Sequence, residues 1–378
     1  MFRILLFALL VPLLAVQAQF GREPVRIFGY FQNTFEMSNA GKDDRDRGPY
    51  NSFLLQQLNL FLQRDIDDHW RAFVNFEVLN SYSSSRGWGA FNLEEAWVSY
   101  RHDNTFTLKL GLQIPIFNQL NTIKNRTPLL PYIIRPLVYE SSFNEFISLD
   151  EFAPSRAFIQ AYGFIPIGRG KIDYAAYVGN GPDINGQSEN GQTAIDTTTH
   201  FLVGGRLGFR HGDVTAGMSV SHEKTNLFES LAPLFNRPIE EFRDLHRVRL
   251  GADVQIHGTD FILEGEWIEV LYEEGSEDVE NDKRFFYLTG GWRATETLML
   301  YASYWQTAEE YSIGIPLFGD IRDYEAQVRV PTGGLSWNFS ERITFKLQYA
   351  YVELDGGEAL FFPAHAFNMY TTAVSVFF

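Results

Sequence analysis

Hydrophobic and polar residues alternate with a period of two along most of this chain. In the segment TFTLKLGLQIP, residues 105–115, every second side chain is aromatic or aliphatic, and most of the side chains between them are polar or small. The segments HRVRLGADVQIH (246–257) and ITFKLQYAYVEL (343–354) repeat the pattern. Successive side chains of a β-strand point to opposite faces, so the pattern predicts strands with one apolar and one polar face.

The connections between these strands alternate between short and long. Seven tight turns, DDH, HDN, IGRG, HGD, HGTD, ATET and SER, follow even-numbered strands, whereas longer polar stretches follow odd-numbered ones. Short periplasmic turns and long outer loops are typical of transmembrane β-barrels. A soluble sandwich or propeller also has alternating strands, but nothing in it requires every second connection to be tight.

We therefore predict an all-β fold, a transmembrane antiparallel β-barrel of 16 strands with periplasmic termini. The strands are expected near residues 25–38, 53–66, 70–81, 91–101, 105–115, 156–166, 171–179, 199–210, 214–223, 246–257, 261–272, 285–293, 298–307, 324–339, 343–353 and 367–378.

Aromatic residues recur beside the tight turns. Trp70 follows DDH, and Tyr100 and Phe106 flank HDN. Phe339 and Phe345 flank SER. Rings at this position form a girdle at the membrane interface of transmembrane barrels, so the recurrence favours the same orientation.

The last segment, NMYTTAVSVFF, ends the chain on two aromatic residues. One face of this strand carries Tyr370, Thr372, Val374, Val376 and Phe378. This resembles the C-terminal targeting signal of bacterial outer-membrane barrels, which implies recognition by the barrel assembly machinery and a Phe378 ring facing lipid. An ordinary final strand is the alternative.

The first residues, MFRILLFALLVPLLAVQAQF, have the order of a secretory signal peptide. One cation, Arg3, precedes an apolar run from Ile4 to Val16 and a small-residue exit at Ala18. A membrane anchor is the alternative, but a spanning helix needs about 20 apolar residues and this run is shorter. We predict a signal peptide over residues 1–18, cleaved after Ala18, and one barrel domain over residues 19–378.

Composition removes several classes of function. The chain has 47 Asp and Glu against 31 Lys and Arg, so it is not a general nucleic-acid binder, which needs clustered excess cations. Cysteine is absent, which excludes disulfides, thiolate metal sites and a Cys nucleophile. No HExxH, GxSxG or Walker-type motif occurs, so we expect no enzyme and no cofactor or metal. An outer-membrane hydrolase stays a remote alternative, which would need Ser and His together on the lipid-facing wall.

A barrel of 16 strands is too wide for side chains to fill and leaves an aqueous channel. The alternation predicts which charged residues point inward to line that water, although each of them could instead lie at a rim. Arg247 and Arg249 could also pair with Glu264 and Glu266 across neighbouring strands. The predicted lumen-lining residues are Arg26, Arg71, Glu77, Glu95, Lys109, Arg206, Arg210, Arg247, Arg249, Asp253, Glu264, Glu266 and Lys346.

One connection, residues 116–155, is far longer than an ordinary loop and unusually apolar. It resembles the third long loop of general porins, which folds into the barrel and narrows the pore. That resemblance implies a constriction with a transverse field. The basic side would carry Lys124, Arg126 and Arg135, and the acidic side Glu145, Asp150 and Glu151. Alternatively, the loop covers a subunit contact, or it hides two more strands and the barrel has 18.

Residues 25–117 resemble the phosphate-selective porin O and P family. The segments that carry the resemblance are RIFGYFQ, LQQLNLFLQRDIDDHWRAFVNFE, LEEAWVSYR and LKLGLQIPIF. In that family a dense ladder of lumenal Arg and Lys selects phosphate, and the mixed charges here do not reproduce it.

We therefore expect a passive diffusion channel for small hydrophilic solutes and ions. It would lie in the outer membrane of a Gram-negative bacterium, in contact with lipid and lipopolysaccharide, and family resemblance implies a homotrimer. A substrate-specific transporter or a phosphate-type anion channel is the alternative.

Overall fold

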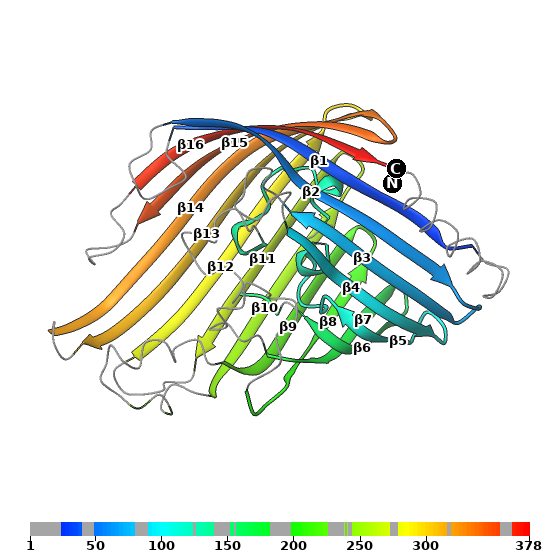
Figure 1. Cartoon of the computed structure of the whole chain (residues 1–378), viewed down its shortest axis with the longest axis horizontal. Coiled ribbons are helices and arrows are strands. Elements are labelled where there is room, and N and C mark those ends of the chain that lie inside the picture. Colours follow the sequence, from blue (N-terminus) through cyan, green and yellow to red (C-terminus); the bar gives the residue numbers. More distant parts are fainter. Residues whose placement is uncertain are drawn as a thin grey trace, which may run out of the picture.

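A computed structural model shows the chain as one closed antiparallel barrel of sixteen strands, in which each strand pairs with its sequence neighbours (Figure 1). Strand β1 pairs with β16 and closes the barrel. The predicted fold class is confirmed. The structure describes residues 24–39, 49–79, 90–123, 126–139, 152–154, 156–181, 198–225, 238, 240, 244–272, 279–315, 319–355 and 365–378. In this part of the chain no helix is long and apolar enough to cross a membrane.

Most strands lie within a few residues of their predicted positions. The strands are β1 (Arg26–Ser38), β2 (Tyr50–Asp65), β3 (Trp70–Leu79), β4 (Ala90–Arg101), β5 (Thr107–Gln113), β6 (Ala157–Ile167), β7 (Gly170–Gly179), β8 (Leu202–His211), β9 (Val214–Thr225), β10 (Leu245–His257), β11 (Phe261–Tyr272), β12 (Val279–Arg293), β13 (Leu298–Ile315), β14 (Gly319–Ser340), β15 (Ile343–Asp355) and β16 (His365–Phe377). Three 3₁₀ turns, η1 (Leu120–Thr122), η2 (Thr127–Leu129) and η3 (Leu137–Tyr139), lie between β5 and β6.

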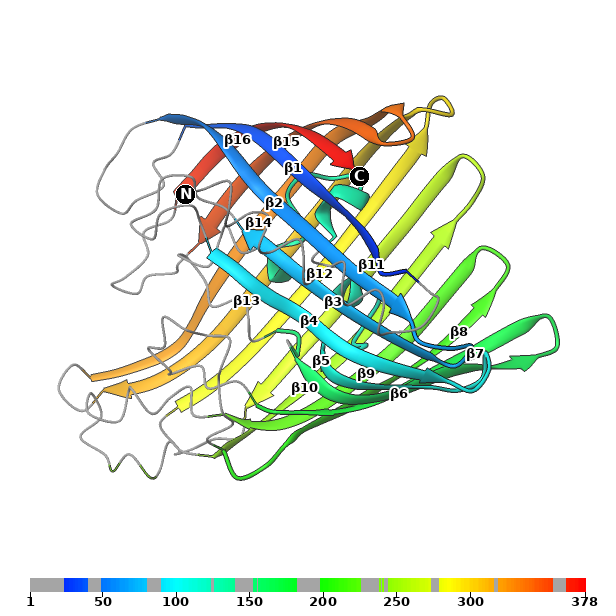
Figure 2. The same ribbon diagram turned by 45° about the vertical axis from the view of Figure 1, so that its right-hand side comes forward.

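Three strands are longer than the sequence pattern predicts. The pairing of β12 with β13 begins at Val279, within the connection expected between the strands at 261–272 and 285–293. Strands β13 and β14 leave only residues 316–318 between them, where a long polar connection was expected (Figure 2). Backbone hydrogen bonds between strands do not depend on the side chains. The paired strands therefore extend beyond the residues whose apolar alternation indicates contact with lipid.

The last strand alternates in burial as predicted. Its inward residues, such as Ala373 and Ser375, are buried, whereas Tyr370 and Phe378 are about half exposed on the outer face. Phe378 completes the closure: its N–H donates to the carbonyl of Gly29, and the N–H of Gly29 donates back, both at 3.0 Å. A Cβ at residue 29 would lie 2.8 Å from the Phe378 ring, so glycine leaves room for that ring.

Two of the tight turns, DDH and HDN, are fixed by aspartate side chains. Asp67 accepts hydrogen bonds from the N–H groups of His69 and Trp70, both at 2.8 Å. Asp103 accepts from the N–H and the hydroxyl of Thr105 at 2.7 and 2.6 Å. These local bonds take the place of ladder bonds where the chain reverses. Beside the turns, exposed rings pack in pairs, including Trp70 with Tyr100 at 5.1 Å and Phe339 with Phe345 at 5.9 Å between centroids.

Candidate pore and its lining

After β5 the chain leaves the wall and enters the barrel. Gly111 has a φ of 117°, and a Cβ there would lie 2.3 Å from the carbonyl oxygen of Ala96, so only glycine fits this bulge. Further on, the N–H of Asn118 donates to the Ser219 hydroxyl of β9 at 2.9 Å. Gly251 of β10 provides space for the Asn118 side chain, which a Cβ would meet at 2.4 Å. The chain therefore crosses the interior from β5 to β9 and β10.

This inward segment, comprising residues 114–123, 126–139 and 152–154, packs on the inner wall of β11–β16 (Figure 2). The two surfaces share one buried apolar cluster, and the predicted inward folding of the long loop is confirmed. The segment contributes Phe117, Leu120, Leu130, Tyr132, Ile134, Val138, Tyr139, Phe152 and Ala153. The wall contributes Ile268, Val270, Phe285, Tyr287, Tyr301, Trp305, Val328, Val330, Ala350, Val352, Phe367 and Met369.

The apolar character of this half of the inner wall differs from the polar lining that the alternation predicted. A signal was present. Phe285, Phe286, Tyr287 and Leu288 form a continuous apolar run, and such runs mark strands that are covered on both faces.

Two predicted lumen-lining carboxylates hold the inward segment instead of facing open water. Glu266 accepts hydrogen bonds from the N–H of Leu120 at 2.6 Å and from the Tyr139 hydroxyl at 2.7 Å. Glu264 accepts from the Tyr132 hydroxyl at 3.3 Å. Both carboxylates point inward, as the alternation predicts, but the segment covers them.

Lys346 of β15 holds the other side of the segment. Its Nζ donates to the carbonyl oxygens of Thr127 at 3.0 Å and Pro128 at 3.2 Å, and to Gln32 Oε1 at 3.0 Å. Gln348 supports the same contact, because its Oε1 accepts the N–H groups of residues 133 and 134 at 2.6 and 2.9 Å. Lys346, which was predicted to line the lumen, is therefore also buried beneath the segment.

Of the predicted constriction residues, two are described. Arg135 lies in the inward segment and is buried, and Arg126 is partly buried. Lys124, Glu145, Asp150 and Glu151 lie outside the described residues. The predicted transverse field therefore stays a prediction.

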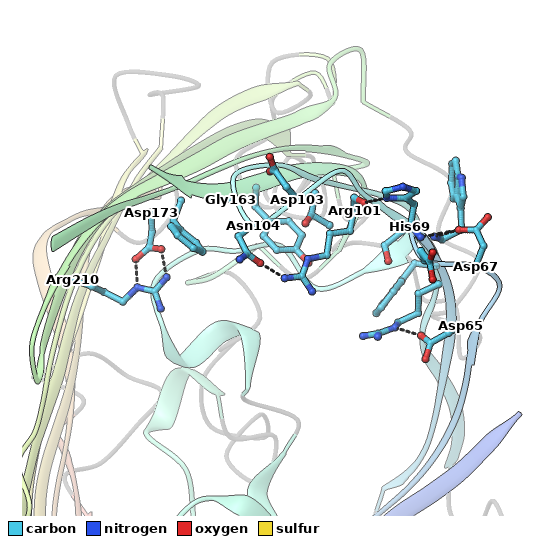
Figure 3. Close-up of a pocket in the computed structure, with 17 residues that line it drawn as sticks. Asp65, Asp67, His69, Arg101, Asp103, Asn104, Gly163, Asp173 and Arg210 are labelled. Carbon is cyan, nitrogen blue, oxygen red and sulfur yellow. Dashed lines mark hydrogen bonds and ion pairs between the residues drawn. The ribbon is translucent and has the colours of Figure 1, made fainter. Parts of the chain in front are cut away.

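The uncovered half of the inner wall carries the open space. A cavity of about 600 Å³ is lined by residues from each of the strands β2–β8 (Figure 3). A second cavity of about 340 Å³ reaches the start of the inward segment at Ile116, Gln119 and Thr122. The two cavities share Tyr162 and Asp173 of the wall, so they adjoin and form the candidate solute path.

The predicted lumen cations along this path are paired or stacked. Arg210 holds Asp173 through two N–H groups, one at 2.6 Å (Figure 3). Arg206 holds Asp253 at 2.6 and 2.9 Å. Asp65 forms ion pairs with two more predicted lumen cations, Arg26 and Arg71. In addition, Lys109 Nζ lies 4.2 Å from the centre of the Trp97 ring.

The other inward charges form a separate buried group. Arg247 and Arg249 both contact Glu223 of β9, which the sequence analysis did not single out. They do not pair with Glu264 and Glu266, because the register sets residues 247 and 249 opposite residues 272 and 270 of β11. Strands β10 and β11 are adjacent, but their register keeps these arginines and glutamates apart.

Two more predicted lumen residues are carboxylates that bond locally. Glu77 accepts a hydrogen bond from Gln57 Nε2 at 2.6 Å, and Glu95 accepts one from Trp97 Nε1 at 2.8 Å. Across the described ranges, no three His, Cys, Asp or Glu side chains converge to hold a metal ion.

Solved structures with this barrel are similar in fold at low sequence identity. The anion-selective porin from Comamonas acidovorans aligns with a TM-score of 0.61 at 14% identity, over 94% of this chain and 100% of that one. The outer-membrane channel DcaP of Acinetobacter baumannii gives 0.59 at 11% identity, over 94% and 97%. OmpF of Salmonella typhi gives 0.59 at 12% identity, over 94% and 100%.

A search of curated protein sequences finds no match. The model of the Gram-negative porins, in contrast, matches residues 8–357, which is most of the chain. The described fold agrees with that match: a closed sixteen-strand barrel holds a long inward segment after β5. The chain therefore belongs to the Gram-negative porin family.

Proposed function

We propose that this passive outer-membrane channel conducts small hydrophilic solutes and ions through an off-centre passage. The observation that carries the proposal is the division of the inner wall: the inward segment covers β11–β16, and the two cavities lie against β2–β10. The passage runs between the first residues of the segment and the uncovered wall. Its width therefore depends on where the segment is held.

Shortening the segment tests this proposal. Replacing residues 125–147 by a short Gly/Ser link should raise single-channel conductance in a planar bilayer, because the sixteen-strand wall alone encloses a wider opening. The same variant should admit larger sugars in liposome swelling. Unchanged conductance, in a barrel shown to be folded, would place these residues outside the path.

The constriction would carry Lys124, Arg126 and Arg135 on one side, with Glu145, Asp150 and Glu151 opposite. Support comes from Arg135, which is buried inside the barrel, and from the resemblance to general porins. Replacing the three basic residues by Gln should shift the reversal potential toward cations, because fixed positive charge at a narrow point repels them.

Phosphate selection of the porin O and P type is the second candidate. A ladder of unpaired lumenal cations would favour it. Arg206 and Arg210 instead each hold an aspartate, which argues for weak ion preference along the passage. Reversal potentials in phosphate and chloride gradients distinguish the two candidates.

A homotrimer is the proposed assembly, in contact with outer-membrane lipid and lipopolysaccharide. The outer membrane protein OmpT of Vibrio cholerae has been solved in a trimer form, and that structure aligns with a TM-score of 0.55 at 9% identity. The barrel assembly machinery is the proposed partner of the C-terminal strand, and residues 1–18 are the proposed signal peptide. Mass measurement of the detergent-purified protein tests both the trimer and the start of the mature chain at Gln19.

A further inference from the structure

The larger cavity opens at the turn end of the barrel, and Figure 3 shows the side chains that line it. Its volume of about 600 Å³ is within the range of small-molecule sites, about 300–1,000 Å³. Its lining is mostly charged and polar, with four aromatic rings among these groups. The residues that line it are Asp65, Asp67, Asp68, His69, Trp70, Arg71, Trp97, Ser99, Arg101, Asp103, Asn104, Thr107, Tyr162, Gly163, Phe164, Asp173 and Arg210.

The charges around this cavity are mixed. Five aspartates and three arginines line it, so the lining has two more acids than bases. Two of the acids, Asp67 and Asp103, already accept backbone N–H groups of their own turns. At the inner end, in contrast, Arg210 and Asp173 pair one to one, so this pair carries no net charge and gives a small ion of either sign no net attraction.

The paired groups instead suit hydroxyl groups. Arg210 and Asp173 hold one another through two hydrogen bonds, which fixes both side chains before any solute arrives. A hydroxyl group both donates and accepts, so neighbouring hydroxyls on one solute match a carboxylate and a guanidinium that lie side by side. Arg101 bonded to Asn104 offers a second set of donors and acceptors (Figure 3).

Local packing holds these groups in place. Tyr174 donates its hydroxyl to the carbonyl of Thr105 at 2.7 Å, which ties the turn after β4 to β7. A Cβ at residue 163 would lie 1.8 Å from the same carbonyl oxygen, so Gly163 lets the turn approach β6. Asn104 and Arg101 are thereby kept at the rim of the cavity.

The Arg210–Asp173 pair lies where the two cavities adjoin, because both residues line both of them. Arg206 also lines the inner cavity, where the buried carboxylate of Asp253 pairs with it. The inner lining also contains Gln119, Thr122, Thr215 and Gln255, whose neutral side chains donate and accept hydrogen bonds. A solute that moves inward therefore passes from the Arg210–Asp173 pair to neutral hydrogen-bonding side chains.

We propose that the Arg210–Asp173 pair is the centre of a subsite for neutral polyhydroxylated solutes of hexose or disaccharide size. The inference rests on the proposed function, because a solute reaches the pair only if the off-centre passage conducts. The subsite retards such a solute on the turn side of the inward segment.

Single-channel recording with glucose and maltose added on the turn side tests the subsite. Both sugars should interrupt the ion current in a dose-dependent, reversible way. In the double variant Arg210→Ala/Asp173→Ala the apparent affinity should fall at least tenfold, while the reversal potential in a KCl gradient stays unchanged because the pair carries no net charge. The control is Arg293→Ala, which removes an exposed arginine that hydrogen-bonds Thr259 outside the cavity and should leave the sugar effect intact.

The outcomes separate the inference from the function on which it rests. Ion current without any sugar effect overturns the subsite and leaves the channel standing, and so does equal sugar block in the double variant. Block by inorganic phosphate in place of sugar also overturns it. A folded protein that conducts no ions overturns the proposed function itself. Should the double variant fail to fold, Asp173→Asn alone should weaken sugar block and shift the reversal potential toward anions.

Discussion

Removing the ammonium group of Lys346 should release the inward segment from the wall. In Lys346→Met the side chain keeps its length, but the carbonyl oxygens of Thr127 and Pro128 and the amide oxygen of Gln32 lose their donor. Hydrogen bonds to a charged group contribute about 1.5–3 kcal/mol each. Two of these bonds reach the segment, so together they contribute about 3–6 kcal/mol. The variant also avoids the cost of burying an ammonium, so we set the net loss at the low end of this sum, about 3 kcal/mol.

A loss of about 3 kcal/mol changes the ratio of docked to released segments about a hundredfold. Trypsin reports this ratio directly, because Arg126 lies in the segment and cleavage follows the population of the open form. We expect cleavage after Arg126 to accelerate about a hundredfold, with a higher and noisier single-channel conductance.

The control is Lys171→Met, a change in a lysine that lies over the Phe164 ring of the uncovered wall. It should leave the trypsin resistance of the segment unchanged. Equal resistance in Lys346→Met and the wild type, both folded, would refute the reasoning. The apolar cluster alone would then hold the segment.

Three further predictions concern the wall, the seam and the turns. Leu110→Arg, on the exposed outer face of β5, should lower barrel stability by about 2–4 kcal/mol, measured by urea unfolding. Lys109→Gln should cost little stability and change the conductance. Swapped effects would show that the assigned facing of β5 is wrong. Deleting Phe378 removes the last pairing of β16 with Gly29 and should slow insertion; wild-type amounts of heat-modifiable protein in the outer membrane would contradict this. Hydrogen bonds from Thr105 hold the pKa of Asp103 below its usual value, so its stabilisation is present above about pH 4 and is lost as the pH falls through the lowered pKa. Asp103→Ala should therefore lower the melting temperature at pH 7, with a difference that shrinks on acidification, and Asp68→Ala in the neighbouring turn serves as the control.

The sequence by itself determined the strands and their faces. The alternation depends on the pleat of each strand, which is a local property. Nine of the thirteen predicted lumen residues are buried, as are the polar residues Gln32 and Thr371, and a lumen-lining role for the set stays a prediction. The strict order of short and long connections likewise set the strand number, because antiparallel neighbours joined in sequence leave one topology for closure. The apolar content of residues 116–155 indicated that this loop must be covered.

What covers the loop was decided only by the tertiary structure. Glu266 and Arg210 have the same inward facing, yet Glu266 is bonded to the inward segment and Arg210 lines an open cavity. The difference depends on contacts between residues more than a hundred positions apart, such as that of Leu120 with Glu266, which no local pattern encodes. Partner choice was decided in the same way: a fixed register sets Arg247 opposite Glu223 of β9 and Tyr272 of β11. Period two assigns a face to each residue, whereas register and docking decide which groups on that face meet.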